Sequence, residues 1–436
     1  NTYSGTTTIS AGTLQLGNAT ASGSVGGGAI VNNGALLFNR TDSYTLPAAN
    51  TMSGIGSLTQ GGSGTLILAN PNTFTGDTKI TAGTLQLAKS LALQNSTLDH
   101  SGTATSFSFG TLTTATLGGL KGSQSLALTN TAAANVTLTV GKNGLSTTYS
   151  GVLSGGGSLA KIGTGTLILA GANSYIGATQ INQGVLQLGA SNRIADTSNL
   201  ILGGGTLATA GFNETLGTLG VNTASTINLG AGASNVRFAD SHVLGWTGIL
   251  TVSNWSGTWG PSGASTAGKL FVGATNSGLQ PAQLANVDFA GYAPSAVQLP
   301  TGEVVPLAPM KGDFNLDHVL TSADLDWMMQ ALTNPTGYEA AKNVSANDLV
   351  LLGDFDGDSS LTNLDLQGLV YILNHPTSPA LSLTFNSGSL ADSVKGLTGT
   401  TDPSNSVPEP TSIILAAIGT ALIVCRQRKC SKASPA

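Results

Sequence analysis

Short segments of alternating apolar and polar residues recur in register along the first half of the chain. The segment 5–16 returns as 76–87 and again as 177–188, with Val, Ile, Leu and Thr at matching places and glycine between the apolar runs. Alternation over such short runs, bounded by glycine, indicates β-strands, and the same glycines and β-branched residues disfavour helices. This part of the chain is therefore expected to consist of repeated short strands.

Two of these copies are preceded, at the same offset, by further strand-like segments. These segments are 56–68 and 157–169, so the repeat unit holds at least three short strands. In the stretch 84–87, which reads Thr-Leu-Gln-Leu, the leucines face one side of a strand and Thr and Gln face the other. Stacked copies would place leucine on leucine inside and polar residues outside, while each backbone pairs with the next copy. The pattern predicts a mainly β solenoid.

The repeats resemble a known family, the autotransporter-associated β-strand repeat. The opening of its pattern, Asn-x-Tyr/Phe-x-Gly, is matched by 72–76 and 173–177. The resemblance implies a right-handed parallel β-helix over residues 1–250, displayed outside the cell. Because Asn1 falls inside a repeat, we expect the true N-terminus to lie upstream. The alternative is a low-complexity linker, but a disordered linker would lack apolar residues spaced in register.

Residues 251–309 follow the repeats with a looser pattern that includes several large aromatic side chains. The aromatic residues in and next to this stretch are Trp246, Trp255, Trp259, Phe271 and Phe289. We interpret the stretch as an irregular β region that caps the apolar end of the solenoid, since aromatic residues commonly complete a core. A platform on which the tryptophans stack against carbohydrate is the alternative.

Charge is distributed unevenly along the chain. Charged residues make up only 8% of it, so hydroxyl and amide groups keep it in solution. Residues 1–309 hold nine Lys/Arg and eight Asp/Glu, whereas 310–376 hold ten Asp/Glu against Lys311 and Lys342. Such a density of acids suggests a cation partner, and the nearly neutral remainder offers no basic face to nucleic acid.

The acidic stretch contains two loops of one pattern, 313–324 and 354–365. Positions one, three, five and twelve carry side-chain oxygens in both loops, position seven would offer its backbone carbonyl, and position nine a hydroxyl acting through water. The ligands expected in the first loop are Asp313, Asn315, Asp317, Val319, Thr321 and Asp324. Those expected in the second loop are Asp354, Asp356, Asp358, Ser360, Thr362 and Asp365. A hard cation with six to eight oxygen ligands fits this set, so the expected cofactor is calcium (Ca2+).

Each acidic loop leads into an amphipathic segment, 325–332 or 366–373, that predicts a helix. The last four residues of each loop have capping-box spacing, with Thr at position nine and Asp at position twelve, so the end of the loop could start the helix. Two loops with matching ligands and matching helices argue against the alternative of a solvated acidic surface. Without metal the clustered carboxylates would repel one another, so 310–376 is expected to fold only when loaded.

The pair of loops is similar to a type I dockerin, whose loops end in Asp where ordinary EF-hands use Glu. The resemblance implies a small α-helical calcium domain over 310–376 that docks to a cohesin-like protein. The sequence departs from the pattern at loop position six, where His318 and Ser359 stand in place of glycine. The loops also start 41 residues apart, which is far for this family.

The C-terminal part predicts a spacer and a sorting tail. Residues 377–406 are rich in Ser, Thr, Gly and Asp, which fits a flexible linker. Pro-Glu-Pro then precedes the apolar run 411–425 and a basic cluster. This order resembles the PEP-CTERM sorting signal over 407–430, which implies a membrane helix at 411–425, cleavage by an exosortase-type peptidase and release to the envelope or exterior. A permanent tail anchor is the alternative.

No catalytic set emerges from residues 1–309, where acids are scattered and the histidines stand alone. A non-enzymatic protein is therefore expected: a secreted, cell-surface adhesive or structural solenoid that meets a glycan or another cell-surface ligand. The alternative is a polysaccharide-degrading enzyme whose catalytic region lies upstream of this chain. Calcium-dependent assembly into a surface layer is a third reading that the sequence leaves open.

Overall fold

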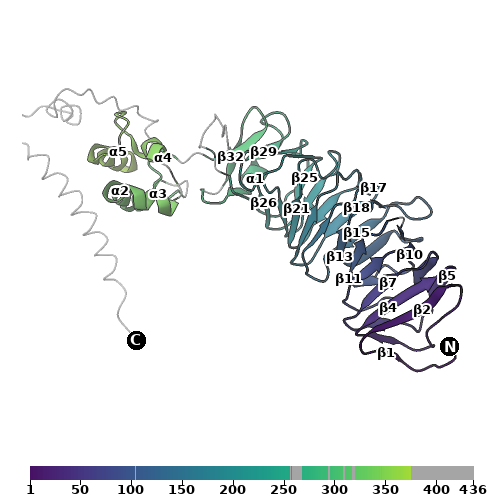
Figure 1. Cartoon of the computed structure of the whole chain (residues 1–436). Helices are drawn as coiled ribbons and strands as arrows, with labels where there is room; N and C mark the ends of the chain where they lie inside the picture. Colours follow the sequence, from purple (N-terminus) through teal and green to yellow (C-terminus); the bar gives the residue numbers. More distant parts are fainter. Residues whose placement is uncertain are drawn as a thin grey trace, which may run out of the picture. The chain divides into compact units, whose positions relative to one another are not determined.

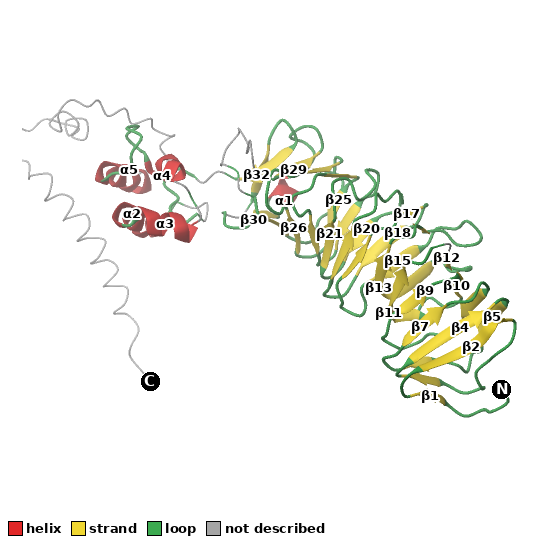
Figure 2. Cartoon of the chain, in the orientation of Figure 1, coloured by secondary structure: helices red, strands yellow, loops and turns green. Residues whose placement is uncertain are grey.

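The computed structural model describes residues 1–374, except 104, 256, 258–267, 293–294, 308–309, 317–319, 343 and 345. Strands make up nearly all of the regular structure up to residue 306, and helices that of 322–374 (Figures 1 and 2). The predicted linker 377–406 and sorting tail 407–430, with the apolar run 411–425, lie outside the described residues.

The strands are short and follow one another closely. The first sixteen are β1 (Thr7–Ile9), β2 (Thr13–Thr20), β3 (Ile30–Asn32), β4 (Ala35–Arg40), β5 (Ser43–Leu46), β6 (Met52–Ser53), β7 (Ser57–Gln60), β8 (Thr65–Leu68), β9 (Thr78–Ile80), β10 (Gly83–Leu87), β11 (Leu93–His100), β12 (Thr105–Ser108), β13 (Thr114–Gly122), β14 (Leu126–Ala127), β15 (Thr137–Val140) and β16 (Thr147–Tyr149). The next eleven are β17 (Leu153–Ser154), β18 (Ser158–Lys161), β19 (Thr166–Leu169), β20 (Thr179–Ile181), β21 (Val185–Leu188), β22 (Leu200–Leu202), β23 (Thr206–Ala208), β24 (Glu214–Leu216), β25 (Leu219–Val221), β26 (Ser225–Asn228) and β27 (Asn235–Phe238). The last five are β28 (Leu250–Ser253), β29 (Lys269–Val272), β30 (Val287–Phe289), β31 (Ala296–Gln298) and β32 (Glu303–Pro306).

The strands from β1 to β30 pair in parallel with the equivalent strands of neighbouring coils. Leu14 pairs with Leu36, Leu36 with Leu58, and Leu58 with Thr78, so one coil takes about 20 residues. Repetition of this step gives a parallel β-solenoid of about eleven coils, which Figure 1 shows stacked from β1 toward β32. The parallel solenoid predicted from the repeats is confirmed, whereas its right-handed sense stays a prediction.

Columns of equivalent apolar side chains fill the interior. One column runs through Leu167, Leu186, Leu207, Ile227 and Val252, which are paired in register and buried. Burying such a side chain contributes about 1.5–3 kcal/mol, so these columns supply most of the stabilisation of the coils. The leucine columns expected from the alternation are therefore present.

The asparagine that opens the repeat pattern joins three successive coils. Oδ1 of Asn173 accepts a hydrogen bond from the Leu153 amide at 2.8 Å, and its Nδ2 donates to the Arg193 carbonyl at 2.7 Å. Asn72 does the same in its own copy, with Met52 at 2.9 Å and Ala92 at 3.0 Å. Both side chains are buried, so each amide satisfies backbone groups that water cannot reach.

A second buried polar position lies at the end of the strand before Gly-Thr-Leu in the two copies 56–68 and 157–169. In one copy it is Gln60, whose Nε2 donates to the carbonyls of Gly62 at 2.8 Å and Gly64 at 3.0 Å. In the other copy it is Lys161, which is 1% exposed. Its Nζ donates to the carbonyl oxygens of Ile162 and Gly163 at 2.7 Å, and of Gln183 at 3.3 Å.

Parallel pairing continues past residue 250, since β28 pairs with β26 and with β30. Among the described strands the direction changes at β32, which is antiparallel to both β29 and β31. Trp255 packs edge-on against Phe289 and Tyr292, at centroid distances of 5.4 and 5.0 Å, and the capping role of 251–309 stays a prediction. Trp259 lies outside the described residues, and the predicted boundary at 250 stays a prediction.

Four helices follow the strands: α2 (Ser322–Thr333), α3 (Pro335–Lys342), α4 (Ala346–Gly353) and α5 (Asn363–Asn374). A short helix, α1 (Pro281–Leu284), lies between β29 and β30. The two helices predicted after the acidic loops correspond to α2 and α5, whereas α3 and α4 were not predicted. None of the helices in the described part of the chain is long and apolar enough to span a membrane.

The buried asparagine bridges predict a stability effect. In Asn173→Ala, the Leu153 amide and the Arg193 carbonyl both lose a partner inside the protein, so we expect the free energy of unfolding to fall by about 1–3 kcal/mol. Urea unfolding followed by circular dichroism measures the change. The matched control is Asn18→Ala, at an exposed position, which should stay within about 0.5 kcal/mol of the parent. Equal effects of the two substitutions would contradict the bridge.

Lys161 predicts a specific pH dependence of stability. Burial lowers its pKa from 10.5 to about 8. Between those values the unfolded chain holds a proton that the folded chain has released, so stability rises as the pH increases and is lost as the pH falls through 8. From pH 8 to pH 9.5 the gain should be about 1–2 kcal/mol. Lys161→Gln, which copies Gln60, should remove this gain when urea midpoints of the two proteins are compared.

Candidate functional site

Three carboxylates come together in the loop that precedes α5. Asp354, Asp356 and Asp358 each offer an oxygen, and these oxygens all lie within 4.8 Å of one another. Asp354 and Asp356 are half-buried and Asp358 is exposed. Oxygen donors at this spacing can surround a hard cation such as calcium. Among the described residues, no other group of three or more metal-binding side chains meets this criterion.

The backbone of this loop turns through left-handed conformations at loop positions four and six. Gly357 has φ +80° and Ser359 has φ +65°. The Ser359 amide donates to Oδ2 of Asp354 at 3.0 Å, and the Asp358 amide to Oδ1 of Asp356 at 3.1 Å. The sharp turn for which EF-hand loops use glycine at position six is therefore made here by serine, at a steric cost that glycine would avoid.

The end of the second loop caps α5. The carboxylate of Asp365 is fully buried, and its Oδ2 accepts from the Thr362 amide at 2.7 Å, while Oγ1 of Thr362 accepts from the Leu364 amide at 3.2 Å. The capping predicted for this loop is confirmed. Asp365 is not a member of the three-carboxylate group. Ser360, the position expected to offer its carbonyl, is exposed.

The first loop is described only in part, because Asp317, His318 and Val319 lie outside the described residues. Asp324 is fully buried at its end, and its two carboxylate oxygens accept from the amides of Asn315 at 3.0 Å and Thr321 at 2.8 Å. The capping box predicted from Thr321 and Asp324 is present at the start of α2. Asp313, at position one, is also fully buried.

Helix α3 contacts the first loop through two residues that sequence reasoning missed. Oη of Tyr338 donates to the Phe314 carbonyl at 2.6 Å, and Nζ of Lys342 donates to the Asn315 carbonyl at 2.9 Å. Burial raises the pKa of Tyr338, and the charges of Asp313 and Asp324 raise it further. The spacing of four residues puts Tyr338 and Lys342 on one face of α3, which is the sequence signal that could have found them.

Lys342 also lies over the indole of Trp327 in α2, with Nζ 3.7 Å from the ring centroid. Trp327 packs in turn against Tyr338, at a centroid distance of 6.3 Å. A cation over the face of an indole is attracted by the ring quadrupole. The ammonium is thus fixed between the first loop and an aromatic ring.

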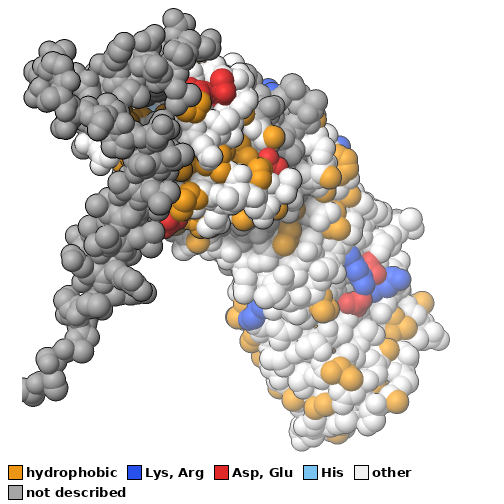
Figure 3. All heavy atoms as spheres, turned by 90° about the vertical axis from the view of Figure 1, so that its left-hand side faces the viewer, with side chains coloured by type: hydrophobic (Ala, Val, Ile, Leu, Met, Phe, Trp, Pro, Cys, Tyr) orange, Lys and Arg blue, Asp and Glu red, His pale blue; other side chains and the backbone are white. Residues whose placement is uncertain are grey.

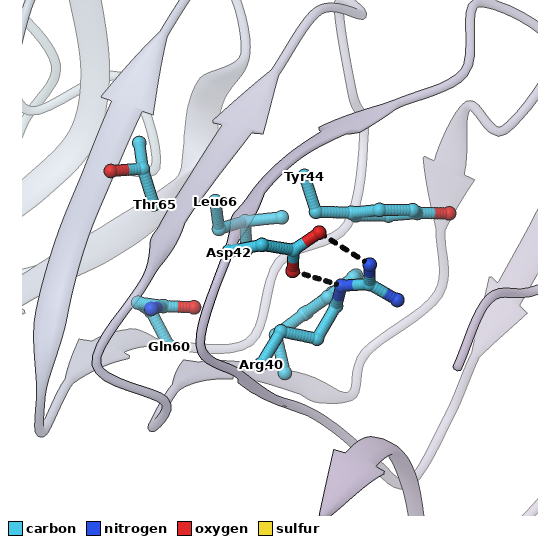
Figure 4. Close-up of a pocket in the computed structure, with 7 residues that line it drawn as sticks. Arg40, Asp42, Tyr44, Gln60, Thr65 and Leu66 are labelled. Carbon is cyan, nitrogen blue, oxygen red and sulfur yellow. Dashed lines mark hydrogen bonds and ion pairs between the residues drawn. The ribbon is translucent and has the colours of Figure 1, made fainter. Parts of the chain in front are cut away.

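A shallow hollow on the solenoid is lined by residues of neighbouring coils, among them Arg40, Tyr44 and Gln60. Figure 4 shows Arg40 between Asp42 and Tyr44, with two hydrogen bonds from its guanidinium to the Asp42 carboxylate, at 2.9 and 2.8 Å. The same guanidinium donates to the carbonyls of Ala21 and Gly23 and stacks on the Tyr44 ring. Because these contacts use its donors, Arg40 fastens a turn and is poorly placed to bind a ligand.

Other ionisable groups of the solenoid also serve the backbone or stand apart. Burial raises the pKa of Glu214 to about 7, although its carboxylate accepts from the amides of Arg193 and Ile194. His100 is buried, and burial lowers its pKa, whereas His242 is exposed beside Asp240. In the described part of the chain neither histidine is hydrogen-bonded to a Ser, Thr or Cys side chain, so no nucleophile and base pair is formed there.

Comparison with known proteins supports the assignment of the repeats. Residues 1–16, 58–87 and 159–188 match the model of a family described as Passenger-associated-transport-repeat. The protein named "Adhesin BmaC autotransporter" from Brucella suis biovar 1 (strain 1330) is 32% identical over 286 residues, which are 52% of this chain and 8% of that protein. The chain thus spans a small part of the length of this relative. No solved structure matches the chain. Asn72 lies in the second of the three matched segments, and Lys161 and Asn173 both lie in the third.

Proposed function

We propose that this chain is a non-enzymatic, adhesive and structural part of a secreted protein that acts at the cell surface. The observation that carries the proposal is the uninterrupted parallel solenoid of about eleven coils. Its interior is filled by apolar columns, and its few ionisable groups are used in turns and bridges. Similarity to an autotransporter adhesin over 52% of the chain supports the same role.

The outer faces of the solenoid offer a surface suited to a neutral polar ligand. One outward column runs through Thr166, Val185, Thr206, Thr226 and Thr251, in register and half-exposed. On the face shown in Figure 3, charged side chains are sparse over the described residues. Rows of hydroxyl groups held at the strand spacing can hydrogen-bond to a glycan without the desolvation cost of charged groups. A glycan or another cell-surface ligand is therefore the proposed partner.

The acidic loops are proposed to bind calcium. In the second loop the side chains of Asp354, Asp356 and Asp358, the Ser360 carbonyl and Asp365 would hold the ion, with Thr362 acting through water. Three converging carboxylates and the left-handed turn at Ser359 support this assignment. The first loop would use the set Asp313, Asn315, Asp317, Val319, Thr321 and Asp324. When bound, calcium would neutralise the carboxylates and tie each loop to its helix.

Further parts of the proposal rest on sequence resemblance. A cohesin-like protein is the proposed partner of 310–376, by resemblance to dockerins. The tail 407–430 is proposed as a PEP-CTERM sorting signal, with membrane insertion through 411–425 and processing by an exosortase-type peptidase. Together these parts would deliver the solenoid to the envelope or exterior.

The adhesive role can be tested with the full chain coupled to fluorescent beads. We expect the beads to bind at least one member of a panel of neutral and acidic glycans, and Thr226→Lys to lower this binding at least about fivefold, because it places a charge in the hydroxyl column. The control is Thr215→Lys, on the separate sheet that contains β24 and β27, which should leave binding unchanged. Release of reducing sugar from any glycan would contradict the non-enzymatic role, and equal loss in both variants would contradict the assigned face.

Removal of the metal tests the calcium proposal. Titration calorimetry of the full chain with calcium chloride should show binding that EGTA reverses, and EGTA should reduce the helical circular dichroism signal, since unneutralised carboxylates repel one another. Asp356→Ala should remove the binding of the second loop while leaving the strand signal intact. A chain that releases no heat with calcium and keeps its helical signal in EGTA would contradict the proposal.

A further inference from the structure

His100 is a titratable side chain buried in the interior of the solenoid. It is the last residue of β11 and is 1% exposed, and neither of its ring nitrogens makes a hydrogen bond within the described residues. Its ring packs against Phe107 of β12, with the ring centroids 6.5 Å apart, and Phe107 packs edge-on against Phe109 at 5.2 Å. In these surroundings a charged imidazolium would lack both water and an acceptor.

The charged residues on the strands next to His100 point away from it. Asp99 precedes it in β11 and pairs with Lys79 of β9 and Lys121 of β13. Because successive side chains of a strand point to opposite faces, these three residues lie on the outer face, where they are exposed or half-exposed. Lys121 also forms an ion pair with Asp77. The sequence of β12, Thr-Ser-Phe-Ser, has no charged residue, so none of these strands directs a carboxylate at the buried ring.

The coil that contains His100 is paired irregularly. Strand β12 is the end strand of its four-stranded sheet and pairs with β10 alone among the described strands. The ladder between β11 and β13 shifts register between Leu93 and Thr97. Segments with an unpaired edge open at a lower free energy than segments paired on both sides. A penalty at His100 therefore acts at a place where the stack of strands is already interrupted.

Acid shifts the balance between the closed and the opened coil. Burial lowers the pKa of His100 below its ordinary value of 6.5, and the nearby backbone of Thr105 and the charge of Asp99 raise it to a smaller extent. As the pH falls below 6.5, the opened coil therefore takes up a proton that the closed coil does not bind. The stability of the closed coil is thus lost as the pH falls, and is regained when the pH rises again.

We infer that His100 is an acid-sensitive release point of the solenoid: at mildly acidic pH, protonation of its ring opens the coil formed by β11, β12 and β13, while more distant coils stay paired. The solenoid then gains a flexible joint near residue 100. The inference concerns the solenoid alone, and it stands or falls independently of the adhesive role and of calcium binding.

Hydrogen exchange of the full chain, read by mass spectrometry and corrected for the intrinsic rate at each pH, tests the inference. Between about pH 7.5 and about pH 5, the protection of peptides from 93–122 should fall at least about tenfold, the effect of one unit in pKa. Peptides from 166–208 should change less than about twofold over the same range. His100→Gln should remove the selective loss, since an amide does not titrate. His100→Ile, which copies the apolar end residue of β9, should do the same.

The matched control is His242→Gln, which removes an exposed histidine paired with Asp240 and should leave the response of the parent unchanged. Glu214 and the other carboxyl groups are common to all these chains, so their own titration cancels in the comparison. An equal loss of protection in the parent and in His100→Gln would overturn the inference. A loss spread evenly over all coils, or no loss in the parent, would overturn it as well, and these two outcomes decide the matter even if both His100 variants fail to fold.

Discussion

Parallel backbone pairing between successive coils is the constraint on which the rest of the structure depends. Because strands of neighbouring coils pair residue for residue, a side chain in a regular stretch of strand lies above its equivalent in the previous coil. The same residue type can therefore recur at one position in successive coils only if its side chains tolerate direct contact with one another. Leucine meets this condition in the interior, as the column from Leu167 to Val252 shows, and threonine meets it outside. Stacked charges would repel one another, which explains why ionisable residues are rare in the solenoid.

The polar residues inside the solenoid meet a need that the coils create. Each corner leaves backbone amides and carbonyls without a partner in the strands, and a buried group of this kind costs about 1–3 kcal/mol. The amides of Asn72 and Asn173 satisfy such groups in the coils above and below. Gln60 and Lys161 hydrogen-bond to backbone carbonyls of the following turn in their two copies, Gln60 through an amide and Lys161 through an ammonium group. The two copies therefore both have a side-chain donor to the turn carbonyls at this position, although the side chain differs.

The features that could be predicted from the sequence depend on residues close together in the chain. The features that could not be predicted depend on contacts between residues far apart in the chain. Strand alternation and the capping boxes at Thr321 and Thr362 are local, and the structure contains both. The bridging role of Asn173 and the hold of α3 on the first loop involve residues 20 or more positions apart, as with Lys342 and Asn315 at 27. Position six of the second loop departs from the dockerin pattern, yet Ser359 adopts the left-handed turn, and its amide donates to the Asp354 carboxylate.

The reversal of direction at β32 ends the parallel pairing in the sheet that contains β29. The last coils leave β29 at the side of one sheet, where its free amides and carbonyls would accept another parallel strand. An antiparallel hairpin, β31 with β32, takes that place instead, and its hydrogen bonds are spaced differently from those of a parallel ladder. An incoming coil from another molecule would find no matching template there. Parallel addition of another molecule along the edge of β29 is thus prevented, because that edge is already occupied by β32.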